Sequence, residues 1–166
     1  SEFSDTMTMQ TDCYNESLTY IPLYYSYASY CEPEDINKWD CKWCNYASTN
    51  FKTENVISTD YLQAFIGYDN DQNQIVISFR GTHNYHDWMK DLEYKQIAYP
   101  NVENAYVHRG FYNSYLAIRN QGLISSLQSL LTTYPDTKDI LITGHSMGGA
   151  LTELCALDMI DNEIIN

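Results

Sequence analysis

An apolar run meets a glycine-rich turn at residues 139–150, DILITGHSMGGA. Its first half predicts a short buried strand over Ile140 to Ile142, and the apolar residues after position 150 predict a helix. Between them, residues 144–148, GHSMG, match the pattern G-x-S-x-G, in which glycines let the chain turn sharply and hold a serine hydroxyl above a sheet. A glycine-rich turn that merely begins a helix is the alternative. The strand and helix on either side favour a reactive serine, Ser146.

Two further apolar runs precede this turn, at residues 62–68 and 75–79. The residues between them are polar, which is typical of a hairpin, so neighbouring strands are expected. Apolar residues at helical spacing predict one long helix over residues 111–134, which Pro135 ends. A strand, a helix and a strand in this order predict a βαβ crossover, and therefore an α/β fold.

The N-terminal third is expected to hold one helix and one loop. Residues 14–30 carry apolar side chains at helical spacing, among them Tyr25 and Ala28, which predicts an amphipathic helix leading into Cys31. The segment from there to about Asn55 is polar and is expected to be a loop. The 166 residues have the length of one domain and contain no repeat or linker.

Composition excludes several classes of partner. A hydrophobic fraction of 44% is enough to build a core, while 22 acidic and 9 basic residues give a net charge of −13 without any basic cluster. This balance disfavours nucleic acid and anionic membrane surfaces, so contact with lipid would be apolar and with neutral lipid. Sixteen tyrosines suit a boundary between water and an apolar phase. No run reaches the roughly 18 apolar residues of a transmembrane helix, and no leader peptide is expected at the first residue.

Five cysteines, at positions 13, 31, 41, 44 and 155, bear on the cellular compartment. The spacing of Cys41 and Cys44 is typical of a small disulfide loop, half of a zinc site, or a redox pair. Polar surroundings favour the disulfide, because a redox C-x-x-C lies at the start of a βαβ unit; a zinc site with Cys13 and Cys31 is the alternative. Those two are not expected to pair, because a helix between them would hold them about 27 Å apart.

Two other features complete this picture. Cys155 lies among apolar residues and is expected to be a buried thiol. Asn15-Glu16-Ser17 is a glycosylation sequon, which is consistent with a secreted glycoprotein. Together with the disulfide loop, it predicts an extracellular location or the lumen of an oxidising or digestive compartment.

An acyl-transfer serine needs two hydrogen-bond donors aimed at the oxygen that becomes negative in the tetrahedral intermediate. The backbone N–H of Met147, directly after the serine, is expected to be the first. The second is expected from the loop after an earlier strand, where Thr82 can offer both its N–H and its hydroxyl. Each such donor is typically worth roughly 3 kcal/mol of transition-state stabilisation. The other reading of Thr82, which is compatible with this one, is an N-cap for the segment that begins at His83.

These motifs, with several others, follow one another in a characteristic order. They are Tyr30-Cys31, Trp39-Asp40-Cys41 with Cys44, Phe79-Arg80-Gly81-Thr82, the residues DWMKDL at 87–92, VHRGF at 107–111, GHSMGGA at 144–150 and CALD at 155–158. In this order they resemble the class 3 lipases, the triacylglycerol lipase family of filamentous fungi. The resemblance runs from about the first helix to the last residue. It implies an α/β-hydrolase fold, of which this chain is the N-terminal part, with a mostly parallel sheet flanked by helices.

The resemblance also assigns cysteines. It implies that Cys41 and Cys44 form a small disulfide and that Cys31 bonds to a cysteine late in the full chain. Cys13 departs from the family pattern, and its partner is not predicted. No metal and no cofactor are implied.

A short helical lid over residues 83–90 is a further implication of the resemblance. Tyr85, Trp88 and Met89 fall on one helical face, which would cover the serine in water and contact lipid when displaced. The alternative is an ordinary surface helix that packs its apolar face on the core. Asp91 is expected to accept a hydrogen bond from the Thr82 hydroxyl and to hold that donor in place.

The sequence lacks half of a catalytic triad. In α/β-hydrolases the carboxylate and the histidine follow the serine, yet no histidine follows Ser146. The ring of His145 is expected to point away from the serine hydroxyl, and His108 is expected to be structural. Asp158 and Asp161 lie about 18 and 22 Å further along the elbow helix, too far to orient the base, and are expected to be solvated.

The expected function is therefore that of a secreted serine lipase that hydrolyses esters of acylglycerols at a lipid interface through an acyl-Ser146 intermediate. The rest of the triad is expected from the C-terminal remainder of the protein, either a second chain disulfide-linked through Cys31 or a region outside these residues. Residues 1–166 alone are expected to be inactive. Alternatives are a phospholipase A1 or a feruloyl-type esterase of the same fold and, in another class, a noncatalytic lipid-binding relic.

Overall fold

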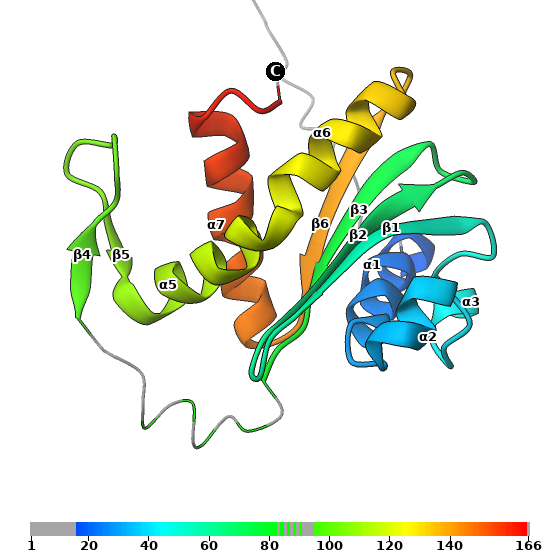
Figure 1. The fold of residues 1–166 in the computed structure, drawn as a ribbon, viewed down its shortest axis with the longest axis horizontal. Helices are drawn as coiled ribbons and strands as arrows, with labels where there is room; N and C mark the ends of the chain where they lie inside the picture. Colours follow the sequence, from blue (N-terminus) through cyan, green and yellow to red (C-terminus); the bar gives the residue numbers. More distant parts are fainter. Residues whose placement is uncertain are drawn as a thin grey trace, which may run out of the picture.

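The computed structural model describes residues 16–82, 84, 86, 88, 90 and 95–165. Helices cover both faces of a four-stranded sheet (Figure 1). On one face lie α1 (Glu16–Ala28), α2 (Pro33–Lys38) and α3 (Cys44–Ala47). On the other lie α5 (Arg109–Ile118), α6 (Ile124–Thr133) and α7 (Met147–Asp161). The expected α/β class is confirmed.

The sheet has the strand order β1 (Phe51–Ser58), β2 (Gln63–Asp69), β3 (Gln74–Phe79), β6 (Asp139–Gly144). The first three strands pair antiparallel, and the pairing of β2 with β3 is the expected hairpin. The strand β6 pairs parallel to β3, as expected for the crossover. In the described residues the sheet is therefore mixed, where a mostly parallel one was expected. Two short strands, β4 (Gln96–Ala98) and β5 (Tyr106–His108), form a separate antiparallel hairpin.

Alternate side chains of the strands build two cores. Phe65 and Val76 pack under α1–α3, whereas Ile66 and Ile77 pack under α5–α7. Every residue of β2 is buried because helices cover both of its faces. The strand β6 was expected to be buried but is only half-buried. Among the described residues it pairs with β3 alone, so its other edge is uncovered.

The polar segment after Cys31 is not the loop expected from the sequence. Pro33 opens α2, with Glu34 and Asp35 in its first turn, which are favourable positions for proline and for acidic side chains. Only Ile36 of this helix is buried, so no apolar period marks it. The strand β1 likewise mixes exposed and buried residues and begins four residues before the expected end of the loop.

The long helix expected over residues 111–134 is two helices. Between α5 and α6 the chain makes a wider turn over Arg119–Leu123, where Gly122 has a φ of +106°. Only glycine adopts this backbone conformation readily, so Gly122 separates the two helices. At the start of α5, His108 Nδ1 accepts the Gly110 N–H at 3.2 Å, which confirms a structural role for this histidine.

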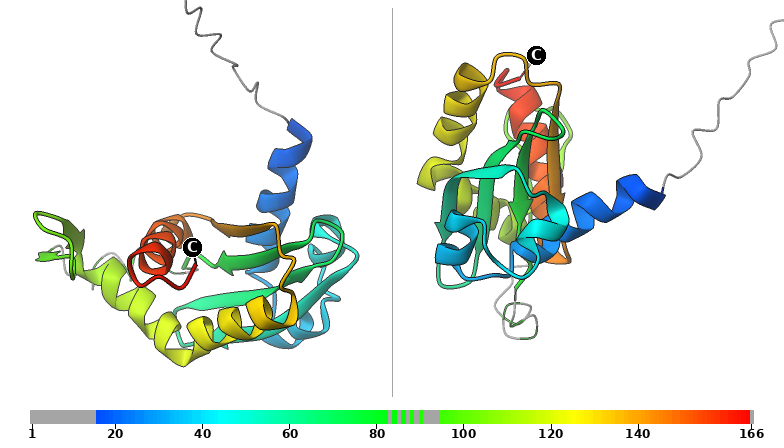
Figure 2. Two further views of the ribbon diagram at one scale, coloured as in Figure 1. Left: turned by 90° about the horizontal axis from the view of Figure 1, so that it is seen from above. Right: turned by 90° about the vertical axis from the view of Figure 1, so that its right-hand side faces the viewer.

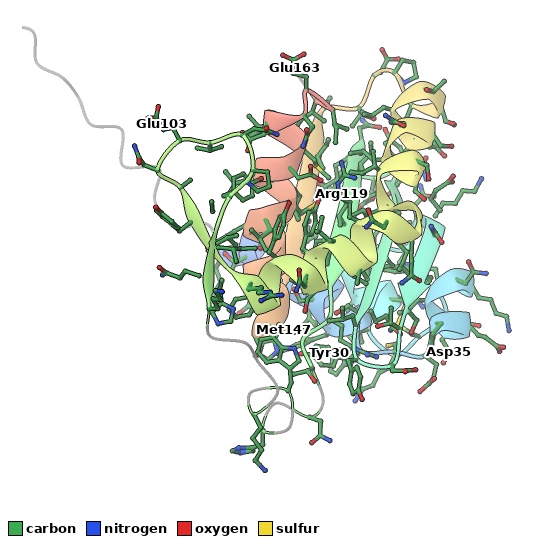
Figure 3. All side chains as sticks on the ribbon, turned by 60° about the vertical axis from the view of Figure 1, so that its left-hand side comes forward. Tyr30, Asp35, Glu103, Arg119, Met147 and Glu163 are labelled. Carbon is green, nitrogen blue, oxygen red and sulfur yellow. A yellow bond between two sulfur atoms is a disulfide. The ribbon has the colours of Figure 1, made fainter. Side chains whose placement is uncertain are left out.

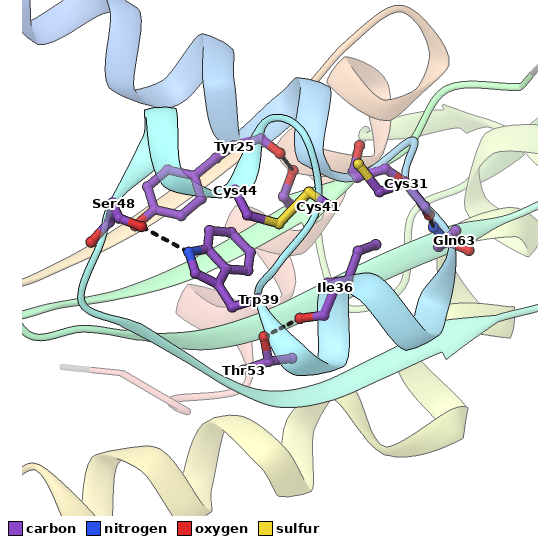
Figure 4. Close-up of a disulfide and its surroundings, with 11 residues drawn as sticks. Tyr25, Cys31, Ile36, Trp39, Cys41, Cys44, Ser48, Thr53 and Gln63 are labelled. Atoms are coloured by element: carbon purple, nitrogen blue, oxygen red, sulfur yellow. Dashed lines mark hydrogen bonds between the residues drawn. A yellow bond between two sulfur atoms is a disulfide. The ribbon is translucent and has the colours of Figure 1, made fainter.

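The expected disulfide between Cys41 and Cys44 is present (Figure 4). It lies beside buried Trp39, whose Nε1 donates to Ser48 O at 2.8 Å. Cys155 is buried, as expected, and Cys31 is a half-buried thiol without a disulfide among the described residues. Cys13 and the sequon at Asn15 lie outside the described residues. None of the described helices has the length and apolar character needed to cross a bilayer.

Candidate active site

Ser146 occupies a sharp turn between the end of β6 and the start of α7. Its φ of 57° and ψ of −123° are unusual for a residue with a side chain, and such strain of about 1–3 kcal/mol is typical of functional sites. Although Ser146 is the N-cap residue of α7, its hydroxyl makes no cap hydrogen bond. A capping serine needs an extended backbone, which Ser146 lacks. The side chain is exposed at the helix N-terminus, in the geometry expected of the nucleophile elbow.

Glycines 144 and 148 make this turn possible. A Cβ atom at Gly144 would overlap the Gly148 carbonyl, and one at Gly148 would overlap the Phe79 carbonyl. Both obstacles are backbone atoms, which cannot rotate away. The first turn of α7 therefore packs directly on the end of β3. Any residue other than glycine at position 148 would prevent this close approach.

Gly81 follows this end of β3 and leads directly into Thr82. A Cβ atom on Gly81 would lie 2.7 Å from His145 O and 3.3 Å from Ser146 Cβ, so the chain passes against the elbow just before Thr82. The half-buried Thr82 accepts the Asn84 N–H on its Oγ1 at 3.2 Å. This bond is a side-chain turn and not the expected N-cap of a helix beginning at residue 83, because Asn84 is not helical and its own carbonyl accepts the first helical bond, from the Trp88 N–H. The turn leaves the hydroxyl proton of Thr82 for a second partner.

Met147 opens α7 with a buried side chain. The next two amides are engaged, because the Gly148 N–H donates to His145 O and the Gly149 N–H to Ser146 O, each at 2.9 Å. Among the described residues nothing accepts the N–H of Met147. It is one of the first helical amides, which carry the partial positive charge of the helix dipole.

Tyr30 ties these parts together, and sequence reasoning did not give it a role. Its hydroxyl lies 2.9 Å from His145 Nδ1 and accepts a hydrogen bond from the backbone of Gly81. Burial raises the pKa of the Tyr30 phenol, and the hydrogen bond from Gly81 opposes this shift. Figure 3 shows Tyr30 and Met147 at the same end of the molecule. The only signal in the sequence was the family motif Tyr30-Cys31.

A model of the family described as Lipase (class 3) matches residues 76–166. The chain belongs to the class 3 lipase family. It is 35% identical to a lipase of Rhizomucor miehei over 127 residues, 75% of this chain and 34% of that protein. It is 29% identical to phospholipase A1-II 6 of Oryza sativa subsp. japonica over 122 residues, 64% of this chain and 29% of that protein.

A solved triacylglycerol lipase, described as having a serine protease triad at its catalytic centre, is similar to this class 3 lipase chain in structure. The TM-score is 0.75 with 33% identity, over 89% of this chain and 55% of that one. This chain therefore spans about a third of the length of its curated relatives and about half of that solved structure.

The expected lid of this class 3 lipase is described only at alternate positions. The Trp88 N–H donates to Asn84 O at 3.0 Å, which is one helical turn, and its half-buried ring packs on Phe111 with 5.3 Å between the ring centroids. Trp88 thus packs on the body of the protein. Tyr85, Met89 and Asp91 lie outside the described residues, so the shared apolar face and the bond from Thr82 to Asp91 stay predictions.

The prediction that Asp158 is solvated is wrong. Its side chain is buried between α7 and α5. It accepts hydrogen bonds from the Tyr115 hydroxyl, from Arg119 Nε at 2.6 Å and from Asn162 Nδ2 at 2.5 Å. The sequence analysis considered only its distance from the serine, not the face of α7 that packs on α5. Asp161 is exposed, as expected.

Proposed function

We propose that the whole protein is a secreted serine lipase that hydrolyses the ester bonds of acylglycerols through an acyl-Ser146 intermediate. The close approach of Gly81 to His145 and Ser146 supports this most directly, since Thr82 is the next residue along the chain. A turn that merely begins a helix has no need of that contact. The Cys41–Cys44 disulfide supports secretion, because disulfides persist in oxidising compartments.

The reaction follows from this geometry. The Ser146 oxygen attacks the ester carbonyl carbon and gives its proton to a histidine, while the carbonyl oxygen becomes negative. The Met147 N–H and the Thr82 N–H and hydroxyl stabilise this oxygen. The ester C–O bond then breaks, the leaving alcohol takes the proton, and water releases the fatty acid from the serine in a second, similar step.

The histidine and its carboxylate belong to polypeptide beyond these residues. All four histidines lie before Ser146, and His145 is engaged by Tyr30. Asp158 is held by Tyr115 on α5 and by Arg119, which directly follows α5. The greater length of the relatives provides room for the missing part.

A phospholipase A1 is the second candidate, favoured by the rice relative of that name. It would use the same serine and the same donors on a diacyl phospholipid. The substrate class therefore has to be decided by comparing emulsified triacylglycerol with phospholipid.

Labelling with a fluorophosphonate tests the proposal on the whole protein, because an activated serine oxygen attacks the phosphorus of this reagent, displaces fluoride and becomes phosphonylated. We expect one label, located at Ser146 by mass spectrometry and absent in Ser146→Ala. Ser125 serves as a control, since Ser125→Ala removes an exposed hydroxyl that, among the described residues, bonds to the nearby Gly122 carbonyl. A protein that resists labelling, or a label that survives Ser146→Ala, would contradict the proposal and favour a noncatalytic relic.

A further inference from the structure

Five aromatic side chains form a continuous patch on α1 and α3. We define the aromatic patch as Tyr20, Tyr24, Tyr27, Trp43 and Tyr46. Ring centroids lie 6.4 Å apart for Tyr20 and Tyr24, 5.3 Å for Tyr24 and Tyr46, and 5.2 Å for Tyr27 and Trp43. Tyr20, Tyr27 and Tyr46 are 46%, 36% and 63% exposed. Apolar side chains gathered on a surface in this way mark an interaction site.

A disulfide and a packed helix constrain the part of the patch around Trp43 and Tyr46. The Cys41–Cys44 disulfide closes the short loop that carries Trp43, and Lys42 Nζ lies 4.5 Å above the indole ring. The helix α3, which carries Tyr46, begins at the same disulfide and packs against α1. A rigid aromatic surface loses little conformational entropy when it binds.

The patch runs toward the candidate active site. Tyr20, Tyr24 and Tyr27 follow one another at spacings of four and three residues, which places them on one face of α1. Tyr30 comes three residues later and contacts His145, the neighbour of Ser146. At 1.5 Å per residue, the helical face from Tyr20 to Tyr27 is about 10 Å long, and Tyr30 lies in the turn that follows α1. Figure 2 shows the first half of α1 extending away from the body of the protein.

We infer that the aromatic patch is a contact surface for neutral lipid, which holds the enzyme at the lipid phase beside its serine. This inference rests on the proposed function, whose substrate is part of a lipid phase. Tyrosine and tryptophan favour the boundary between headgroups and hydrocarbon, because their rings are apolar and their O–H and N–H groups are polar. The net charge of −13 opposes binding to anionic lipid, so the patch favours uncharged or zwitterionic surfaces.

Vesicle binding tests the inference apart from catalysis. The whole protein carrying Ser146→Ala is mixed with phosphatidylcholine vesicles, and the bound fraction is measured by sedimentation. Replacing three exposed tyrosines of the patch, Tyr20→Ser, Tyr27→Ser and Tyr46→Ser, should weaken partitioning about tenfold. Phosphatidylglycerol added to the vesicles should weaken binding of the parent protein. The matched control, Leu157→Ser with Ile160→Ser, removes side chains that are 47% and 63% exposed on α7 and should change binding less than twofold.

Activity supplies a second readout in protein that retains Ser146. The triple variant should hydrolyse emulsified substrate about tenfold more slowly at low lipid concentration and a short, dissolved ester at the parent rate. If the proposed function fails, both esters remain unhydrolysed while the vesicle result still stands.

Equal vesicle binding by the parent and the triple variant would overturn the inference, as would equal losses in the triple variant and the α7 control. Self-association that the triple variant abolishes, with vesicle binding intact, would assign the patch to a second copy of the chain instead and would also overturn it.

Discussion

The absence of a Cβ atom at Gly81 lets the chain before Thr82 pass close to the turn that holds Ser146. A methyl group there would lie 2.7 Å from a backbone oxygen of the elbow. Gly81→Ala should therefore displace Thr82 and lower kcat/KM for a dissolved ester about 100-fold, in line with the loss of one oxyanion donor. Gly149→Ala is the control, because its Cβ would meet only Gly144 O at an ordinary 3.8 Å. Similar rates for both variants would show that Thr82 takes no part.

The Tyr30 hydroxyl is a second single group that contacts the residues next to Ser146 and Thr82. Tyr30→Phe keeps the ring and removes the hydrogen bonds with the Gly81 backbone and His145 Nδ1. We expect about a tenfold loss in kcat with little change in the melting temperature, since the hydroxyl positions the loop before Thr82. A variant that loses activity only in proportion to its loss of folded protein would indicate a purely structural role.

At the scale of elements, Asp158 joins α7 to α5. Asp158→Ala would leave the buried Tyr115 hydroxyl and the partly exposed Arg119 without their acceptor. We expect the free energy of unfolding, measured with urea, to fall by about 2–3 kcal/mol. This is less than the loss for a fully buried ion pair, because the Arg119 side chain is 30% exposed and solvent weakens its interaction with Asp158. Glu153→Ala, an exposed acid on the same helix, should change stability by less than about 0.5 kcal/mol.

The packing of α5 on α7 also predicts a pH dependence. Burial raises the pKa of the Cys155 thiol to about 12, above its ordinary value near 9. A raised pKa in the folded state stabilises the protein below pH 9, and this contribution is lost as the pH rises toward 12. The free energy of unfolding should therefore fall over this interval, and less so in Cys155→Ala. An identical decline in both proteins would contradict the shift.

Elements also show where sequence reasoning succeeds. The runs that became β2, β3 and β6 are apolar and bounded by polar residues, and the elbow is a local motif, so both are visible in the sequence. The helix α2 buries only Ile36, so its sequence shows no apolar residues at helical spacing. The break between α5 and α6 depends on the backbone angle of Gly122, which the pattern of apolar residues does not reveal. Tyr30 and Asp158 gain their partners through tertiary contacts 115 and 39 residues distant, which no local pattern contains.

At the scale of the whole molecule, these 166 residues contain the proposed nucleophile and the proposed donors but no histidine after Ser146. Purified residues 1–166 should show no esterase turnover, while the whole protein should be active. Intact mass before and after reduction should also reveal a disulfide through Cys31 in the whole protein. Robust hydrolysis by residues 1–166 alone would overturn the assignment of the base to the remainder.

The parallel pairing of β3 with β6 sets Phe79 opposite Gly144, and the first turn of α7 packs on that same Phe79 carbonyl. The serine and the loop that we propose to stabilise its intermediate are thus aligned by one ladder of backbone hydrogen bonds. A slip of one residue in that ladder would move each part past the other. Recovery of catalysis during refolding should therefore coincide with correct strand alignment, so that enzyme assays can report when the sheet has assembled.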